Sequence, residues 1–213
     1  MESNKYLDDI SEIKNMMSRS TRFISLSGLS GILAGIYALI GATLAYLRLK
    51  TLSDANYAGF SGRHTTLWGT DVVQDLSIIA IAVIVFAAVT GFVMTLRKSK
   101  KSGEKIWNTS SRRLVFNFLI PLFAGGAFCL VLIQYGIAGL VAPATLIFYG
   151  LACVNASKYT LGDVRYMGFA FIILGLIATQ FIGYGLYFWA LGFGLCHIIY
   201  GAFMHFKYDR NKK

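Results

Sequence analysis

The chain has 213 residues, of which 56% are hydrophobic and 14% charged, with a mean hydropathy of +0.60 and a formal net charge of +10. A soluble domain is roughly one quarter charged, so this composition excludes an ordinary soluble domain. The positive charge does not indicate a nucleic-acid-binding protein, because the basic residues lie in short segments beside apolar runs, with no soluble recognition module. Basic residues in such places are typical of membrane topology and of contact with anionic lipid head groups.

The N-terminal segment, residues 1–22, is rich in charged residues and has no apolar core of the signal-peptide type. Its apolar residues Leu7, Ile10, Ile13 and Met17 recur at spacings of three and four, which predicts an amphipathic helix over Ser3–Ser18. We expect this helix either to lie on the cytoplasmic membrane surface or to dock a protein partner, and the pattern favours neither.

Six apolar segments follow, each about as long as the roughly 20-residue helix that spans a bilayer core. They are Phe23–Leu47, Val72–Leu96, Leu114–Tyr135, Ile137–Ser157, Val164–Ile182 and Tyr184–Phe206. Only Gly136 separates the third from the fourth and only Gly183 the fifth from the sixth, so we expect each pair to form a tight helical hairpin. The sequence therefore predicts an all-α polytopic membrane protein, with a six-helix transmembrane bundle over residues 23–206 and a basic cytoplasmic tail at 207–213.

The distribution of lysine and arginine predicts the orientation. With the N-terminus inside, all but Arg48, Lys50 and Arg63 of the 20 basic residues fall on the inner side. Because positive charge in short loops marks the cytoplasmic side, we expect both termini in the cytoplasm. The longest outer loop is then Arg48–Asp71, and the basic inner loop is Arg97–Arg113.

Small residues recur along several of the predicted spans. They include Gly28, Gly31 and Gly35 in the first span, Gly168 and Gly175 in the fifth, and Gly192, Gly194 and Gly201 in the last. Because close backbone approach drives helix association in lipid, these residues predict tight packing within the chain or a homo-oligomer through one glycine face. Pro121, inside the third span, should free the carbonyl of Asn117 and bend the helix.

Four polar residues within the apolar segments are candidates for an intramembrane site. Asp75, Gln134 and Gln180 lie toward the outer ends of their spans, and His197 lies near the middle of the last one. Buried polar groups in membranes often mark substrate or ion pathways, so Asp75, Gln134 and Gln180 could line one outward-facing pocket, and His197 could relay protons. Asp75 also has a structural interpretation, as a carboxylate stabilised near a helix N-terminus. His197 has one as well, which is a hydrogen bond to a carbonyl or tyrosine of a neighbouring helix.

The sequence offers no set of residues for catalysis or for a cofactor. Cys129, Cys153 and Cys196 are scattered through apolar runs without the spacing of a disulfide framework or a zinc site. No second histidine lies at the depth of His197, as haem with two histidine ligands would need. We therefore expect no cofactor, no metal and no enzymatic activity.

Three stretches resemble an uncharacterised family of small six-span bacterial membrane proteins. They are Phe-Ile-Ser-Leu-Ser-Gly-Leu-Ser-Gly at 23–31, Ala-Pro-Ala-Thr-Leu-Ile-Phe-Tyr-Gly at 142–150 and His-Ile-Ile-Tyr-Gly at 197–201. The resemblance implies a location in the bacterial inner membrane and brings no functional residue with it.

Two functions remain, and the polar residues slightly favour the first. The first is a small-solute or ion permease or channel, built around the polar candidates. The second is a non-catalytic sensor, assembly factor or regulatory subunit, whose protein partner would engage Ser3–Ser18 and the basic inner loop. A membrane enzyme ranks behind both, because no acid, base and nucleophile converge.

Overall fold

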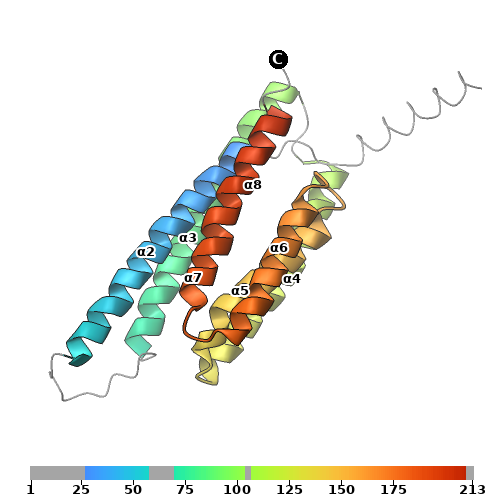
Figure 1. Ribbon diagram of the computed structural model, residues 1–213. Helices are drawn as coiled ribbons and strands as arrows, with labels where there is room; N and C mark the ends of the chain where they lie inside the picture. The colour runs from blue at the N-terminus through green and yellow to red at the C-terminus, as the bar shows by residue number, and fades with distance from the viewer. Residues whose placement is uncertain (1–26, 58–69, 104–106, 210–213) are drawn as a thin grey trace, which may run out of the picture.

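The computed structural model describes residues 27–57, 70–103 and 107–209, and every regular element in these ranges is helical (Figure 1). The elements are α2 (Gly28–Tyr57), α3 (Thr70–Ser102), α4 (Thr109–Gln134), η1 (Ala138–Leu140), α5 (Val141–Ala156), α6 (Val164–Gln180), α7 (Gly185–Trp189), η2 (Ala190–Cys196), α8 (His197–Met204) and η3 (His205–Asp209). The last four follow one another without a break, and η2 and η3 are π-helical. The predicted N-terminal amphipathic helix lies outside the described residues.

Within residues 27–57, 70–103 and 107–209, five helical segments are long and apolar enough to cross a membrane. They are Gly28–Thr51, Val72–Lys101, Thr109–Gln134, Ala138–Ala156 and Gly185–Tyr208. The apolar part of α6, Val164–Ala178, is shorter than these. Many large apolar side chains point outward, and no residue of α3 between Val73 and Lys98 is buried. An all-helical chain with an apolar exterior is a helical membrane protein.

Two helices are longer than the apolar segments that predicted them. α2 continues past Leu47 to Tyr57, and α3 continues past Leu96 to Ser102. A helix makes its backbone hydrogen bonds internally and needs no apolar surroundings to continue, so an apolar run underestimates its length. The loops expected at Arg48–Asp71 and Arg97–Arg113 are correspondingly shorter.

The start of α4 is defined by a reciprocal cap. Asn108 Oδ1 accepts a hydrogen bond from the backbone N–H of Ser111 at 2.7 Å, and Ser111 Oγ accepts one from the backbone N–H of Asn108 at 2.9 Å. Together the two bonds satisfy donors that the first turn of a helix leaves free. α4 therefore begins at Thr109, still within the basic segment.

Both predicted tight hairpins are confirmed. Gly136 has φ of +72° and Gly183 has φ of +102°, which side-chain-bearing residues rarely adopt. They reverse the chain after α4 and after α6, at what we call the hairpin end of the molecule. The opposite, basic end holds the start of α2 and the end of η3, and its basic side chains include Arg97, Lys98, Lys100, Lys101, Arg112, Arg113, Lys158, Arg165 and Lys207.

The predicted glycine packing occurs within one chain. A Cβ added at Gly28 would collide with the backbone of Gly201 and His205, and one added at Gly201 would lie 2.6 Å from the amide nitrogen of Ile32. Between α5 and α6, a Cβ at Gly150 would lie 2.6 Å from the carbonyl oxygen of Gly168. The backbones of α2 and α8, and those of α5 and α6, therefore touch at glycine. The homo-oligomer stays a prediction.

The two glycine contacts are built alike. At identical spacings, α2 carries Gly28, Ile32, Gly35 and Ala38, and α6 carries Gly168, Ile172, Gly175 and Ala178. A Cβ added at Gly35 would lie 2.6 Å from Cγ1 of Ile198 in α8. At the matching Gly175, it would lie 2.6 Å from Cγ1 of Ile147 in α5. The pair of α2 with α8 thus corresponds to the pair of α6 with α5, and both α2 and α6 begin at the basic end.

The helices form two sets of three. In the first half, α2 packs against both α3 and the final helix, α7–η3; in the second half, α5 packs against both α4 and α6 (Figure 1). Large side chains fill the contact between the halves, where Leu146 and Phe171 of the second half approach Gly192 of the first. Packing is therefore backbone against backbone between α2 and α8 and between α5 and α6. Side chains fill the α2–α3 and α4–α5 contacts, at Gly41 and Gly125, and the contact between the halves.

The carbonyl freed by Pro121 finds a partner in the neighbouring helix. Asn155 Nδ2 of α5 donates a hydrogen bond to the backbone oxygen of Asn117 at 2.9 Å, and it lies 3.3 Å from Asn117 Oδ1. The predicted loss of a helical hydrogen bond at Pro121 is thus compensated between helices. The position of Pro121 in the sequence identifies the Asn117 carbonyl as the free acceptor. The tertiary structure supplies its donor, Asn155.

This contact leads to a double-mutant prediction. Asn155→Leu should lower the free energy of unfolding by about 1–2 kcal/mol, because it leaves the Asn117 carbonyl without a partner. In a Pro121→Ala background the same substitution should cost less than half as much, because residue 121 then donates its own N–H to that carbonyl. Unfolding in mixed micelles measures both values, and equal costs in the two backgrounds would contradict the assignment.

Candidate functional site

The structure does not bring together the four polar residues that the sequence singles out. The carboxylate of Asp75, whose side chain is 38% exposed, lies 2.7 Å from Nε of Arg48 on α2. Gln134 and Gln180 are exposed, and Gln180 Nε2 contacts only the adjacent Thr179 Oγ1, at 3.2 Å. In the described part of the chain, these three share no hydrogen bond with one another or with His197.

His197 is the one buried member of the set. It is 8% exposed, and its Nε2 lies 2.7 Å from the hydroxyl of Tyr149 on α5. The predicted hydrogen bond to a tyrosine of a neighbouring helix is therefore confirmed. Because His197 belongs to the first half and Tyr149 to the second, the bond joins the two halves near the middle of the final helix.

A cage of aromatic rings surrounds this pair. The centroid of the Tyr149 ring lies 4.9 Å from that of Phe171 and 5.0 Å from that of Phe193. The Phe118 ring meets Tyr149 edge-on, with centroids 5.8 Å apart. The His197 ring lies 5.2 Å from Phe171 and stacks on Phe193 at 6.0 Å. The hydrogen bond is thus held in an apolar environment, where polar interactions are strengthened and unpaired polar atoms are costly.

The second ring nitrogen of His197, Nδ1, is buried, and the helix immediately before this residue is π-helical. The π-helical segment η2 ends immediately before His197. Within the described residues, Nδ1 is buried and has no partner with good hydrogen-bond geometry. Single π-helical turns occur frequently at functional sites, and a buried polar atom without a partner calls for an explanation.

Sequence reasoning missed Tyr149, although it found His197. Tyr149 lies in a run of apolar and aromatic residues, where a tyrosine resembles a core residue or an interfacial anchor. The available signal was position, because Tyr149 lies well inside its span while anchoring tyrosines lie at the membrane surface. A tyrosine at that depth needs a hydrogen-bond partner.

A second polar contact between the halves lies at the basic end. Asp163, just before α6, accepts hydrogen bonds from Lys207 Nζ at 2.6 Å and from the Tyr208 hydroxyl at 3.0 Å, both in η3. The Lys207 side chain is 45% exposed and that of Asp163 is 20% exposed. The pair therefore closes the basic end of the contact between the halves, within reach of water.

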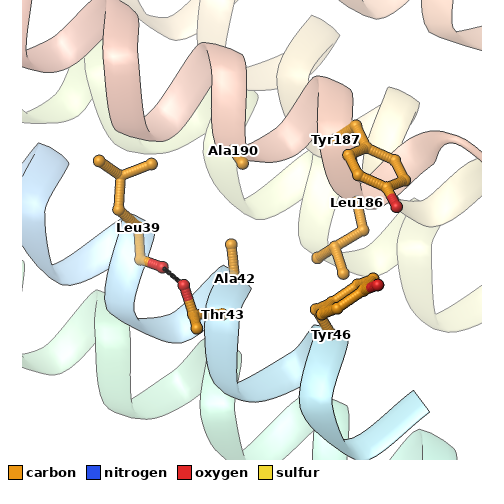
Figure 2. A pocket seen from close by; sticks show the side chains of 7 residues that line it. All are labelled: Leu39, Ala42, Thr43, Tyr46, Leu186, Tyr187 and Ala190. Carbon is orange, nitrogen blue, oxygen red and sulfur yellow. Dashed lines mark hydrogen bonds between the residues drawn. The ribbon is translucent and has the colours of Figure 1, made fainter. Parts of the chain in front are cut away.

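A shallow groove near the hairpin end contains none of the four candidates. It has a volume of about 190 Å³ and is lined by Leu39, Ala42, Thr43, Tyr46, Leu186, Tyr187 and Ala190 (Figure 2). The Thr43 hydroxyl points back to its own helix and donates to the carbonyl of Leu39 at 2.8 Å. The groove thus offers an apolar surface between α2 and α7.

The chemistry available at the buried pair is proton transfer. Neutral imidazole accepts a proton at Nε2 and becomes a cation, and a tyrosine hydroxyl both donates and accepts. In the described residues, no group of histidine, cysteine and carboxylate side chains is suited to hold a metal ion.

Comparisons of the chain with protein-family models, with curated proteins and with solved structures found no match.

Proposed function

We propose that the chain is a six-span protein of the bacterial inner membrane, with both termini in the cytoplasm. The sixth span is α6, whose 17 residues are about 25 Å long and lie at the lower limit for crossing a bilayer core. The concentration of basic side chains at one end supports the orientation, because that end then meets anionic lipid at the cytoplasmic face. The resemblance to small six-span bacterial proteins favours the same location.

In this membrane the protein would act as a small-solute or ion permease whose transport is linked to a proton at His197. The observation that carries the proposal is the 2.7 Å contact between His197 Nε2 and the Tyr149 hydroxyl, buried between the two halves. An ionisable residue at such a place is costly and commonly serves transport or proton relay. Protonation of His197 would also place a positive charge within the contact between the halves and so change the stability of that contact.

The packing supplies moving parts for such a cycle. Backbone contacts at glycine join α2 to α8 and α5 to α6, so each of these two helix pairs would move as a rigid unit. Contacts between the halves are made by rings, by the His197–Tyr149 bond and by the Asp163 contacts at the basic end. Rigid-body rocking of two units about a central site is how many transporters alternate access, often with repeated elements. The matching glycine patterns of α2 and α6 favour this comparison.

Flux in reconstituted vesicles tests the proposal. The full chain is placed in liposomes and offered a panel of small ions, weak acids, amines and polyols, with and without an imposed pH gradient. We expect at least one solute to equilibrate at least tenfold faster than in protein-free liposomes, with a rate that depends on the pH gradient. Vesicles as impermeable as protein-free ones to the whole panel would overturn the proposal.

A second function is favoured by the exposure of α3. This helix packs chiefly on α2, and its exposed apolar residues include Ile78, Ile81, Ile84, Phe86 and Phe92. Such a surface suits a membrane partner of a sensor, assembly factor or regulatory subunit, or a second copy of this chain. Deleting residues 1–18 should then remove a co-purifying protein while the bundle stays folded, and unchanged co-purification would count against this alternative.

A further inference from the structure

Polar side chains continue from the His197–Tyr149 pair toward the basic end. Tyr149, Tyr200 and Tyr208 all pack against one buried cluster, which contains Leu146, Cys153, Leu161, Val164, Met167, Phe171 and Met204. Cys153, a member of that cluster, lies one helical turn beyond Tyr149 on α5. At the end of the series, Tyr208 donates to Asp163, which is partly exposed to water.

Tyr200 occupies the middle of this series. It lies three residues after His197 on α8, on the side nearer the basic end. Together with Tyr149 and Tyr208, it packs against the buried cluster that contains Cys153. Its hydroxyl is buried and has no hydrogen-bond partner among the described residues. A buried hydroxyl among polar groups is suited to bind an internal water molecule.

Toward the hairpin end, by contrast, rings cover His197. Phe193 stacks on the imidazole, and Trp189 lies 5.0 Å from Phe193 on the far side. Phe171 of α6 also lies against the imidazole, with ring centroids 5.2 Å apart. None of these three rings could relay a proton to the imidazole, whereas the polar side chains described above lead toward the basic end.

We propose that Tyr200 connects Asp163 to the Tyr149–His197 pair as a proton relay, so that His197 exchanges protons with the basic side of the membrane. A proton entering beside Asp163 reaches the Tyr200 oxygen through bound water, as Tyr200 releases its own proton through water toward Tyr149. The Tyr149 oxygen takes up that proton and gives its own to Nε2 of His197. Each hydroxyl ends with one proton, and the net result is one imidazolium.

The other titratable groups near the relay do not offer a second route. Around His197, α5 contributes Tyr149 and Cys153, while α6 and η2 contribute the rings of Phe171 and Phe193. Cys196 precedes His197 on the same helix, and Lys207 engages Asp163 at the exit. The relay rests on the proposed function, since it treats His197 as the group that takes up the proton.

Time-resolved protonation of His197 tests the relay. The full chain, with isotope-labelled histidine, is placed in lipid nanodiscs and subjected to a pH jump while infrared bands of imidazole are followed. The bands of His197 are those lost in His197→Gln. Tyr200→Phe keeps the ring and removes the hydroxyl, so it should slow protonation at least tenfold and leave the protonated fraction at equilibrium unchanged. Tyr187→Phe, an exposed tyrosine at the hairpin end, is the matched control and should keep the parental rate.

The outcomes separate the relay from the proposed function. A parental rate in Tyr200→Phe would overturn the relay and leave His197 as a proton site reached by another route. A His197 that never becomes protonated between pH 4 and 9 would overturn both. Helical content and elution in detergent show whether Tyr200→Phe is folded. Should it misfold, Tyr208→Phe, which removes the hydroxyl bonded to Asp163, takes its place with the same expected slowing.

Discussion

Gly201→Ala is expected to destabilise the bundle by roughly 3 kcal/mol or more. The added Cβ would lie 2.6 Å from the amide nitrogen of Ile32 and 2.7 Å from the carbonyl oxygen of Gly28. Both atoms belong to the backbone of α2, so no side-chain rotation relieves the clash. The two helices must separate, and the first half loses the contact that holds it together.

Gly126→Ala provides the matched control. Gly126 lies inside α4, and a Cβ added there meets no atom within 4 Å. Because alanine favours a helix over glycine, this variant should be as stable as the parent or more stable by about 0.5–1 kcal/mol. Unfolding in mixed micelles, with elution behaviour as a second readout, compares the two. Equal stability of Gly201→Ala and Gly126→Ala would contradict the packing of α2 on α8.

His197→Gln is expected to lower pH-gradient-dependent flux at least tenfold. Glutamine retains a hydrogen-bonding group opposite Tyr149 but takes up no proton between pH 4 and 9. The substitution therefore separates the effect of protonation from that of packing. Asp75→Asn should change flux less than twofold, because Asp75 forms a partly exposed ion pair with Arg48 away from the contact between the halves. The same vesicle assay measures both variants against the parent.

Comparing the loss of flux in His197→Gln with that in Asp75→Asn shows which of the two residues transport depends on. A larger loss in Asp75→Asn than in His197→Gln would place the functional site at the hairpin end of α2 and α3. It would then support the outward-facing pocket that the sequence suggests, in place of the buried pair. Measuring protein content and orientation in each vesicle preparation ensures that the comparison concerns activity per molecule.

Much of the architecture could be predicted because membrane constraints act locally along the chain. Long apolar runs give the helices, and single glycines between runs give the hairpins at Gly136 and Gly183. The glycines of the first and last spans predicted close helix packing, but they did not identify these two spans as partners, which the contact of α2 with α8 shows. Pro121 identified the free carbonyl of Asn117, because the missing N–H is a property of the proline itself.

The candidate site could be predicted only in part. Sequence position gives the depth of a residue in its span, and it leaves open which way the residue faces. Asp75 and Gln134 lie near the same end but on separate helices, and Asp75 pairs with Arg48. Tyr149 was missed because its partner lies 48 residues away. The π-helical segment before His197 depends on tertiary packing, which no local pattern encodes.

The central claim is that His197 is buried between the two halves and held there by Tyr149. Nitrogen-15 spectroscopy of the full chain in lipid bilayers, with labelled histidine, tests it most directly. We predict that the Nε2 signal of His197 shifts in Tyr149→Phe and stays unchanged in Tyr187→Phe. We also predict that it exchanges with heavy water far more slowly than free histidine does. A His197 signal that ignores the loss of the Tyr149 hydroxyl and exchanges as fast as free histidine would contradict the account.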